Sequence, residues 1–282
     1  PGQGSQKPGM GLDFFNSSEP AKRMFGQADE ILGFGLSRLC FNGSEEELKS
    51  TENAQPAIFL VSAVAYRLLS ERGVKPSFAA GHSLGEYSAL YAAGSLLFET
   101  ALELVRKRGL RMKESGEANK GAMAACLGLD RRAVAEACEK AKDAGVVVPA
   151  NFNCPGQIAI SGSVKAVEKA CEYIKAAGGK AIPLAVSGAF HSPLMENARL
   201  AMKGELESVA LAAPSISFVA NVTADVESSP DRIRELLVKQ IVSPVMWEDS
   251  MNRMSAAGSA VFIEAGPGRV LGGLAKKISR DF

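Results

Sequence analysis

A serine flanked by two glycines constrains the fold of this chain more than any other feature of its sequence. Residues 81–85 read GHSLG, after a short apolar run at residues 77–80 and before a helix-like stretch that reaches Ala93. This is the GxSxG pattern of a strand that turns sharply into a helix, with the serine at the tip of the turn. The glycines let neighbouring backbone approach closely, so the hydroxyl is exposed above the strand end. The pattern predicts an α/β fold with Ser83 as a nucleophile and the N–H of Leu84 as one oxyanion donor.

The composition is that of a globular protein and indicates neither nucleic acid nor membrane as a partner. The chain has 282 residues, of which 46% are hydrophobic and 22% charged, enough to bury a sizeable core. The 32 basic residues nearly balance the 31 acidic ones, for a net charge of +1. The longest apolar run, Ala57–Tyr66, is shorter than the roughly 18 residues of a membrane span, and Arg67 ends it.

The cysteines and histidines argue against a metal site or a disulfide framework. The five cysteines form no CxxC motif, and the chain has only two histidines. We therefore expect no metal and no bound cofactor. Unpaired thiols are typical of a reducing compartment, which predicts a cytoplasmic location.

The pattern along the chain predicts two subdomains. Residues 1–117 are typical of helices with a few buried strands, including a buried helix at Ala57–Arg72 with Pro56 at its first position. After the second subdomain the chain returns to long helices and short strands. We expect helices at Leu194–Val209 and Arg232–Gln240, and strands at 217–220 and 260–264.

Residues 119–188 have a different rhythm, in which strands and amphipathic helices alternate. The pattern predicts the order βαββαβ, which is the ferredoxin-like arrangement. The expected elements are strands at 122–129, 146–151, 157–161 and 181–186 and helices at 131–144 and 164–177. The predicted fold is an α/β-hydrolase-like catalytic subdomain at residues 1–118 and 189–282 with an inserted ferredoxin-like subdomain at 119–188.

A nucleophilic serine needs a general base, and the chain offers two histidines. His82 directly precedes Ser83, and adjacent side chains diverge in a tight elbow, so His191 is the better candidate. The alternative is that His191 is a structural histidine in a loop. No Asp or Glu near His191 obviously completes a triad, so a backbone carbonyl is a candidate for its orienting group.

Arg108 lies in the basic segment 106–113, for which the sequence leaves two interpretations open. The segment could be a solvated face of a helix. Alternatively, one of its arginines could bind a substrate carboxylate with both arms of its guanidinium.

Four motifs in this order resemble the malonyl-CoA:acyl carrier protein transacylases of type II fatty acid synthesis. They are PGQGSQ at 1–6, GHSLGEYSA at 81–89, GAFHSPLM at 188–195 and EAGPG at 264–268. The resemblance spans nearly the whole chain. It implies malonyl-CoA and acyl carrier protein as partners, and a malonyl-serine intermediate. Members of this family usually begin with a short hydrophobic strand before the first motif, so we expect such a strand to be missing here.

The resemblance also implies the roles of individual residues in catalysis. Ser83 resembles the acylated nucleophile and His191 its base. Gln240 matches the position whose backbone carbonyl orients the histidine, and the backbone N–H of Gln3 matches the second oxyanion donor beside that of Leu84.

Further positions match those that bind the substrate. Arg108 resembles the residue that binds the malonyl carboxylate. Gln55 and Asn153 fall where the family lines its pocket with amides. Phe190 resembles the family's marker for malonyl over methyl-branched malonyl units, because its bulk would fill the space of a 2-methyl group.

Three other functions stay open at this point. A serine esterase or thioesterase shares the elbow but normally has an acidic triad residue. An acyltransferase domain of a polyketide synthase would carry nearly the same motifs. A non-catalytic module that binds a carrier protein would not need both Ser83 and His191.

Overall fold

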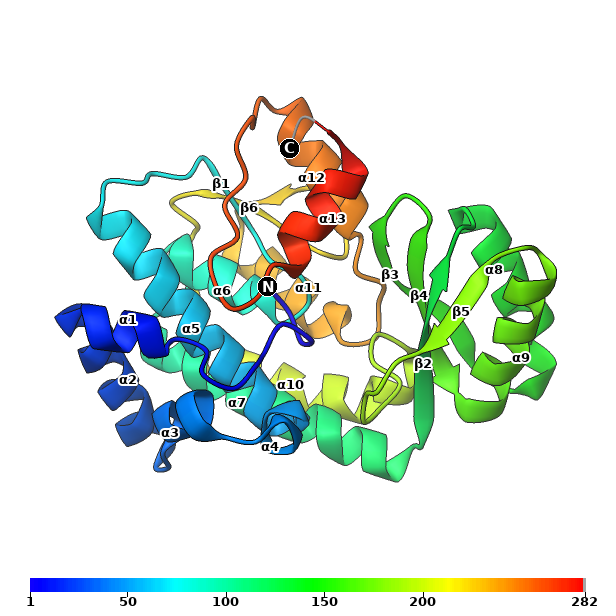
Figure 1. The fold of residues 1–282 in the computed structure, drawn as a ribbon, viewed down its shortest axis with the longest axis horizontal. Coiled ribbons are helices and arrows are strands. Elements are labelled where there is room, and N and C mark those ends of the chain that lie inside the picture. The colour runs from blue at the N-terminus through cyan, green and yellow to red at the C-terminus, as the bar shows by residue number, and fades with distance from the viewer. Residues whose placement is uncertain (281–282) are drawn as a thin grey trace.

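Two sheets and the helices around them make up the described part of the computed structural model, residues 1–280 (Figure 1). The first sheet has three strands in the order β1-β6-β7, with bounds Phe78–Ala80, Ser217–Val219 and Val226–Glu227. β1 and β6 are parallel, and β7 is antiparallel to β6. Since β1 leads directly into the GHSLG segment, this sheet places the predicted nucleophile.

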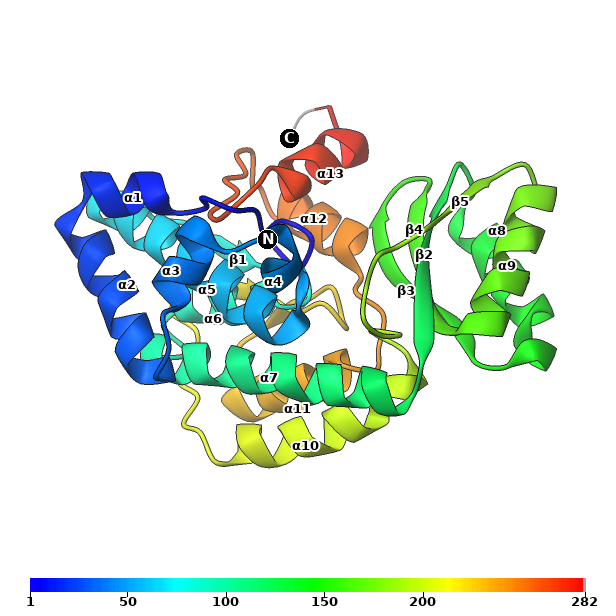
Figure 2. The same ribbon diagram turned by 60° about the horizontal axis from the view of Figure 1, so that its bottom comes forward.

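Helices surround the first sheet and account for most of this part of the chain. The two longest, α5 (Thr51–Glu71) and α7 (Phe98–Ala118), pack so closely that a Cβ on Gly109 would lie 2.7 Å from Glu52 Cα. Figure 2 shows α7 running beside α10, which also packs against α11. The other helices here are α1 (Leu12–Ser17), α2 (Glu19–Leu32), α3 (Leu36–Asn42), α4 (Glu45–Lys49), α6 (Gly85–Ala92), η2 (Pro193–Met195), α10 (Glu196–Glu207), α11 (Pro230–Gln240), α12 (Trp247–Ala256) and α13 (Val270–Ile278).

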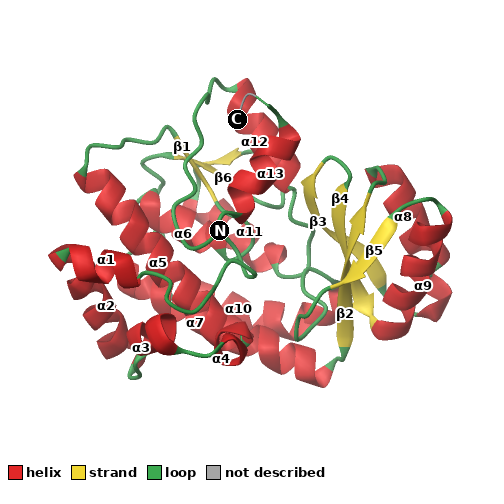
Figure 3. Ribbon diagram, viewed as in Figure 1, coloured by secondary structure: helices red, strands yellow, loops and turns green. Residues whose placement is uncertain are grey.

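The second sheet has the predicted βαββαβ order. Its strands pair as β3-β4-β2-β5, each antiparallel to its neighbour, which is the ferredoxin-like arrangement. Helices α8 and α9 lie on one side of it (Figure 3). The elements are β2 (Gly121–Leu127), α8 (Arg131–Lys140), η1 (Lys142–Ala144), β3 (Val147–Cys154), β4 (Gln157–Ser163), α9 (Val164–Ala176) and β5 (Lys180–Pro183). The fold class predicted from the sequence is therefore confirmed, while the subdomain boundaries at 118/119 and 188/189 stay a prediction.

Backbone hydrogen bonds and ion pairs join the second sheet and its helix α8 to residues 245–249, where α12 begins. Phe152 N–H donates to Val245 O at 2.9 Å, and Val245 N–H donates to Ala150 O at 2.9 Å. Nearby, Arg131 donates to Asp249 at 2.7 and 2.8 Å and to Glu248 at 3.0 Å. Strand β3 is thereby fixed against the segment that leads into α12.

Two sequence-based expectations about elements are wrong. The helix expected to begin at Pro56 begins at Thr51, with Pro56 inside it. Proline cannot donate to the carbonyl four residues earlier, that of Glu52. Arg106 of α7 donates to this carbonyl instead, so the helix continues through the proline.

The strand expected at residues 260–264 is absent from both sheets of the described chain. The side chains of Val261 and Ile263 are exposed, and the segment is irregular. A strand requires hydrogen bonds to a neighbouring sheet edge, and apolar residues in alternation do not supply them.

No helix among residues 1–280 is long and apolar enough to cross a membrane.

Candidate active site

The GHSLG segment forms a strained turn between β1 and α6. Ser83 has a φ of 52°, in the left-handed region that residues other than glycine rarely adopt. A Cβ at Gly81 would lie 1.9 Å from backbone atoms of Gly85, so the turn can close only with glycine at position 81. Such a conformation costs on the order of 1–3 kcal/mol and persists only where the surroundings hold it.

Asn221 holds both sides of this turn. Its Oδ1 accepts from Ser83 N–H at 2.7 Å, and its Nδ2 donates to Gly81 O at 2.7 Å. Asn221 follows β6, the parallel neighbour of β1, so the two strand ends bring it to the turn. One buried side chain therefore satisfies two backbone groups that the left-handed turn leaves without partners.

His191 lies within hydrogen-bond reach of the serine. Its Nε2 is 2.8 Å from Ser83 Oγ, and its Nδ1 is 2.9 Å from the backbone carbonyl of Gln240. Because a carbonyl can only accept, Nδ1 carries the proton and Nε2 presents its lone pair to the serine hydroxyl. Burial, and after it the positive charge of Arg108, lowers the pKa of His191 to about 3, so the imidazole is neutral at pH 7.

His82 has a different environment. Its Nε2 is 2.9 Å from Asn153 Oδ1, and its ring lies 5.7 Å from that of Trp247 between centroids. Burial lowers its pKa to about 4. The structure thus places Asn153 beside His82, and Asn153 is connected to Ser83 indirectly, through this neighbouring histidine.

Arg108 is the one member of the basic segment 106–113 with a fully buried guanidinium, at 1% exposure. It donates to Gln55 Oε1 at 2.8 Å, to Gln240 Oε1 at 2.8 Å and to Ser83 Oγ at 3.1 Å. All three acceptors are neutral, and no carboxylate among residues 1–280 forms a salt bridge with it. A buried cation without a paired anion is costly, so this group favours a bound carboxylate beside Ser83.

The other cations of this segment have partners elsewhere. Arg106 donates to Asn53, Lys107 pairs with Glu205, Arg111 with Glu114 and Lys113 with Glu52. The interpretation as a solvated or structural face therefore fits these four residues, and the carboxylate-binding interpretation fits Arg108 alone.

The first loop of the chain lies against the turn. A Cβ on Gly2 would lie 2.6 Å from His82 O, which brings the backbone of Gln3 close to the elbow. Within residues 1–280, the N–H groups of Gln3 and Leu84 donate to no other protein group. Both N–H groups are therefore available to an oxyanion, while the Gln3 side chain donates to Thr51 Oγ1 at 3.2 Å.

The two remaining predicted residues are buried. Gln55, on α5, is fully buried and binds Arg108, so it belongs to the network around the serine. Phe190, 6% exposed, directly precedes His191 and packs into the main hydrophobic core.

The structure brings together two residues that the sequence analysis missed. Glu86 accepts from Asn221 N–H and from the side-chain amide of Gln240, and burial raises its pKa to about 8. Position offered a signal for both: Glu86 directly follows the GHSLG segment, and Asn221 follows a predicted strand. In α/β sheets, functional groups gather at the carboxyl ends of parallel strands.

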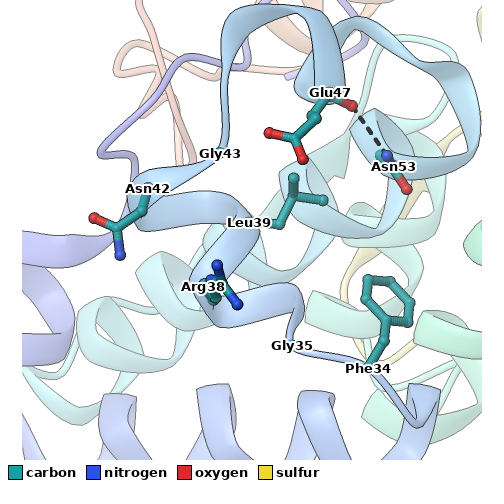
Figure 4. A pocket seen from close by; sticks show the side chains of 8 residues that line it. All are labelled: Phe34, Gly35, Arg38, Leu39, Asn42, Gly43, Glu47 and Asn53. Carbon is teal, nitrogen blue, oxygen red and sulfur yellow. Dashed lines mark hydrogen bonds between the residues drawn. The ribbon is translucent and has the colours of Figure 1, made fainter.

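Two cavities lie away from this network. One of about 440 Å³ is lined by eight residues between Phe34 and Asn53, where Asn53 donates to Glu47 O (Figure 4). Another of about 540 Å³ is lined by residues of the segments Lys7–Asn16 and Gly266–Gly268, and by Val61. Ser83 lines neither cavity, so these two cavities do not mark the candidate active site.

Comparison with known proteins agrees with this geometry. The acyl transferase domain family matches residues 1–277, so an acyl transferase is the class that fold and site define. Malonyl CoA-acyl carrier protein transacylase of Bacillus subtilis is 49% identical over 99% of this chain and 89% of that protein. The protein of the same name from Escherichia coli K12 is 44% identical over 99% of this chain and 91% of that protein. This chain belongs to the family of malonyl CoA-acyl carrier protein transacylases.

Solved structures give the same result. An acyl carrier protein S-malonyltransferase from Vibrio cholerae superimposes with a TM-score of 0.97 at 41% identity, covering 100% of this chain and 93% of that one. A malonyl-transacylase in complex with a type II PKS acyl carrier protein matches with a TM-score of 0.97 at 41% identity, covering 100% and 92%.

Proposed function

We propose that Ser83 is the acylated nucleophile and His191 the general base of a malonyl transfer. The protein is an acyltransferase that moves a malonyl group from malonyl-CoA to the phosphopantetheine thiol of acyl carrier protein, in fatty acid biosynthesis. The assignment of roles rests on the surroundings of one atom, Ser83 Oγ. Ser83 Oγ lies 2.8 Å from a neutral imidazole nitrogen and 3.1 Å from a buried guanidinium nitrogen.

In the first half-reaction Ser83 Oγ attacks the thioester carbonyl, and its proton moves to His191 Nε2. The Gln240 carbonyl, at 2.9 Å from Nδ1, holds the ring and stabilises the imidazolium that forms. The backbone N–H groups of Gln3 and Leu84 donate to the tetrahedral oxyanion. The C–S bond then breaks, and His191 gives its proton to the departing CoA thiolate, which leaves a malonyl-serine ester.

In the second half-reaction the same groups act in reverse. The thiol of the phosphopantetheine arm loses its proton to His191 Nε2 and attacks the ester carbonyl. The C–O bond to Ser83 breaks, and the imidazolium returns the proton to Oγ. This is a ping-pong mechanism, in which one acyl group occupies the serine between two thiols.

Arg108 is the proposed binding group for the malonyl carboxylate. Its planar guanidinium can donate two parallel hydrogen bonds to the two carboxylate oxygens. Gln55 orients the guanidinium by accepting from Nη1 at 2.8 Å. We further propose that Phe190 restricts the space at the 2-position of the acyl group, and that Asn153 acts on the pocket through His82.

A serine hydrolase is the less favoured alternative. The proposed base is oriented by a backbone carbonyl, where a hydrolase usually has a carboxylate, and a buried arginine beside the nucleophile has no task in the hydrolysis of neutral esters. A role in polyketide synthesis would use the same groups, and one structural relative is a malonyl-transacylase in complex with a type II PKS acyl carrier protein. We propose a cytoplasmic location on the basis of the five cysteines, all of which are unpaired.

Intact mass tests this proposal directly. Malonyl-CoA alone should add one malonyl group to the protein, peptide mapping should place it on Ser83, and Ser83→Ala should abolish it. Addition of holo acyl carrier protein should remove the label faster than water does. Malonate mapped to a cysteine such as Cys154 would overturn the mechanism, and loss of the label to water at the same rate as to the thiol would favour the hydrolase.

A further inference from the structure

The side-chain amide of Gln240 lies between two buried ionisable groups, the Glu86 carboxyl and the Arg108 guanidinium. Its Oε1 accepts from Arg108 Nη2 at 2.8 Å, and its Nε2 donates to Glu86 Oε2 and to Ser83 O, the latter at 2.8 Å. Glu86 and Arg108 are each 1% exposed, and neither forms a salt bridge among residues 1–280. The amide therefore connects a carboxyl group that accepts through both of its oxygens to a guanidinium that can only donate, and these two groups do not touch each other.

An amide can fulfil this role in one orientation only. If Gln240 were rotated by half a turn, its nitrogen would face the donors of Arg108, and its oxygen would face the acceptors Glu86 Oε2 and Ser83 O. Asn221 adds a further constraint, because its backbone N–H donates to Glu86 Oε1. Each oxygen of Glu86 therefore accepts from a different fixed donor, and the carboxyl group is held by its own partners.

On the basis of the proposed function, we infer that Glu86 is a positioning residue for acyl-group selection. It fixes the orientation of the Gln240 amide, and the amide in turn fixes the Arg108 guanidinium that binds the malonyl carboxylate. Glu86 does not touch the substrate in this arrangement. Its effect reaches the acyl group through two hydrogen bonds, and it should matter for carboxylated acyl groups more than for neutral ones.

The isosteric change Glu86→Gln separates this role from simple packing. The N–H of Asn221 requires an oxygen at one arm of the new side chain, so the amide nitrogen takes the other arm. That nitrogen then faces Gln240 Nε2, which is also a donor. The conflict is relieved only if Gln240 turns or moves, and either change removes Gln240 Oε1 as an acceptor of Arg108 Nη2, which leaves that nitrogen only Ser83 Oγ. The substitution thus preserves the shape of residue 86 but removes a hydrogen bond that orients the Arg108 guanidinium.

The test measures kcat/KM for malonyl-CoA and for acetyl-CoA, with wild type in parallel as the assay of the proposed function. Misplacement of a positioned group by about 1 Å can reduce a rate by about 100-fold, so the malonyl/acetyl ratio of Glu86→Gln should fall by about 10- to 100-fold. In an Arg108→Ala background the same substitution should leave the ratio unchanged, because the guanidinium it positions is gone. Wild-type protein without malonyl transfer would refute the proposed function, whereas an unchanged ratio in Glu86→Gln would refute only this inference.

Glu52→Gln is the matched control. Glu52 is also a largely buried carboxyl, but it binds Lys113 and Ser50 rather than Gln240, so its neutralisation should leave the malonyl/acetyl ratio as in wild type. If Glu86→Gln does not fold, as judged by thermal unfolding, Gln240→Leu tests the same connection and keeps the backbone carbonyl that binds His191. The same selective loss is expected from it, and equal losses for both thioesters would overturn the inference.

Discussion

Replacing Arg108 by alanine should remove the preference for a carboxylated acyl group. In the free protein the guanidinium is buried and donates only to neutral acceptors, those of Gln55, Gln240 and Ser83. The malonyl carboxylate would be its first anionic partner in direct contact. Truncating one member of a buried, hydrogen-bonded charge pair costs about 2–5 kcal/mol. Because burial here is nearly complete, we expect about 3–4 kcal/mol, which corresponds to about 100- to 1,000-fold in kcat/KM for malonyl-CoA.

The malonyl/acetyl ratio isolates this effect from damage to the site. Arg108→Ala also leaves the amide oxygens of Gln55 and Gln240 without a donor, and that cost applies to both thioesters. Acetyl transfer needs no carboxylate partner, so beyond this shared cost it should fall little or improve, and the malonyl/acetyl ratio should collapse toward unity or invert. Arg108→Lys should recover only part of the ratio, since an ammonium cannot bind both oxygens in the planar manner of a guanidinium.

The assay is steady-state kinetics with malonyl-CoA and acetyl-CoA on wild type, Arg108→Ala and Arg108→Lys. Arg111→Ala is the matched control, because it lies one turn further along α7 and pairs with Glu114 at the surface. It should leave the ratio unchanged. Equal losses for the two thioesters in Arg108→Ala would mean that Arg108 is structural or binds the CoA portion, and the carboxylate-binding role would have to be reassigned.

His191→Ala should slow acylation of the serine by about 10²–10⁴-fold, whereas His82→Ala should affect the proton-transfer step less. Single-turnover labelling measures both rates; a larger loss in a folded His82→Ala variant than in His191→Ala would exchange the roles of the two histidines. For His82, folding lowers the pKa from 6.5 to about 4, so the unfolded chain takes up a proton that the folded protein excludes as the pH falls from 6.5 to 4. Relative to His82→Gln, wild type should therefore lose about 1.4 kcal/mol of unfolding free energy per pH unit in that window, measured by urea denaturation; parallel curves would contradict the burial of a neutral imidazole. Gly81→Ala should destabilise by about 3 kcal/mol because its Cβ would lie 1.9 Å from backbone atoms of Gly85. Gly26→Ala should be neutral or stabilising, because its Cβ would meet no atom within 4 Å beyond its own helix backbone; equal melting temperatures for the two variants would refute the steric argument.

Local patterns in the sequence determined the elements that depend on short-range physics. The turn at Ser83 was predictable because a glycine on either side is what a sharp strand-to-helix turn requires, and the βαββαβ order followed from the alternation of apolar periodicities. Local reasoning was wrong where a distant residue satisfied a backbone group. Proline at position 56 predicts the start of a helix, but Arg106 of another helix takes the freed Glu52 carbonyl and lets the helix run on.

The reverse error occurred at residues 260–264. Their apolar run has the composition of a strand, but strands exist only where an edge is available for pairing, and sequence does not report the edges of a sheet. The position and count of the histidines singled out His191 as the better base, and the missing carboxylate pointed to a backbone carbonyl. Which carbonyl was known only from the family resemblance, because any peptide group in the chain could have supplied it.

What only the tertiary structure decided is how the charged groups are partnered. In the sequence, Arg108 is one cation among several on a helix, and its burial becomes visible only once α7 packs against α5 and Arg108 reaches Gln240 at the end of α11. Glu86 lies in α6 and Asn221 in the turn after β6, yet they meet beside Ser83 and hold its backbone and the Gln240 amide. Hydrogen bonds between residues far apart in the chain depend on distances of a few tenths of an ångström, and periodicity and spacing carry no information on that scale. The sequence therefore determined which chemistry was available, and packing determined which groups act on one another.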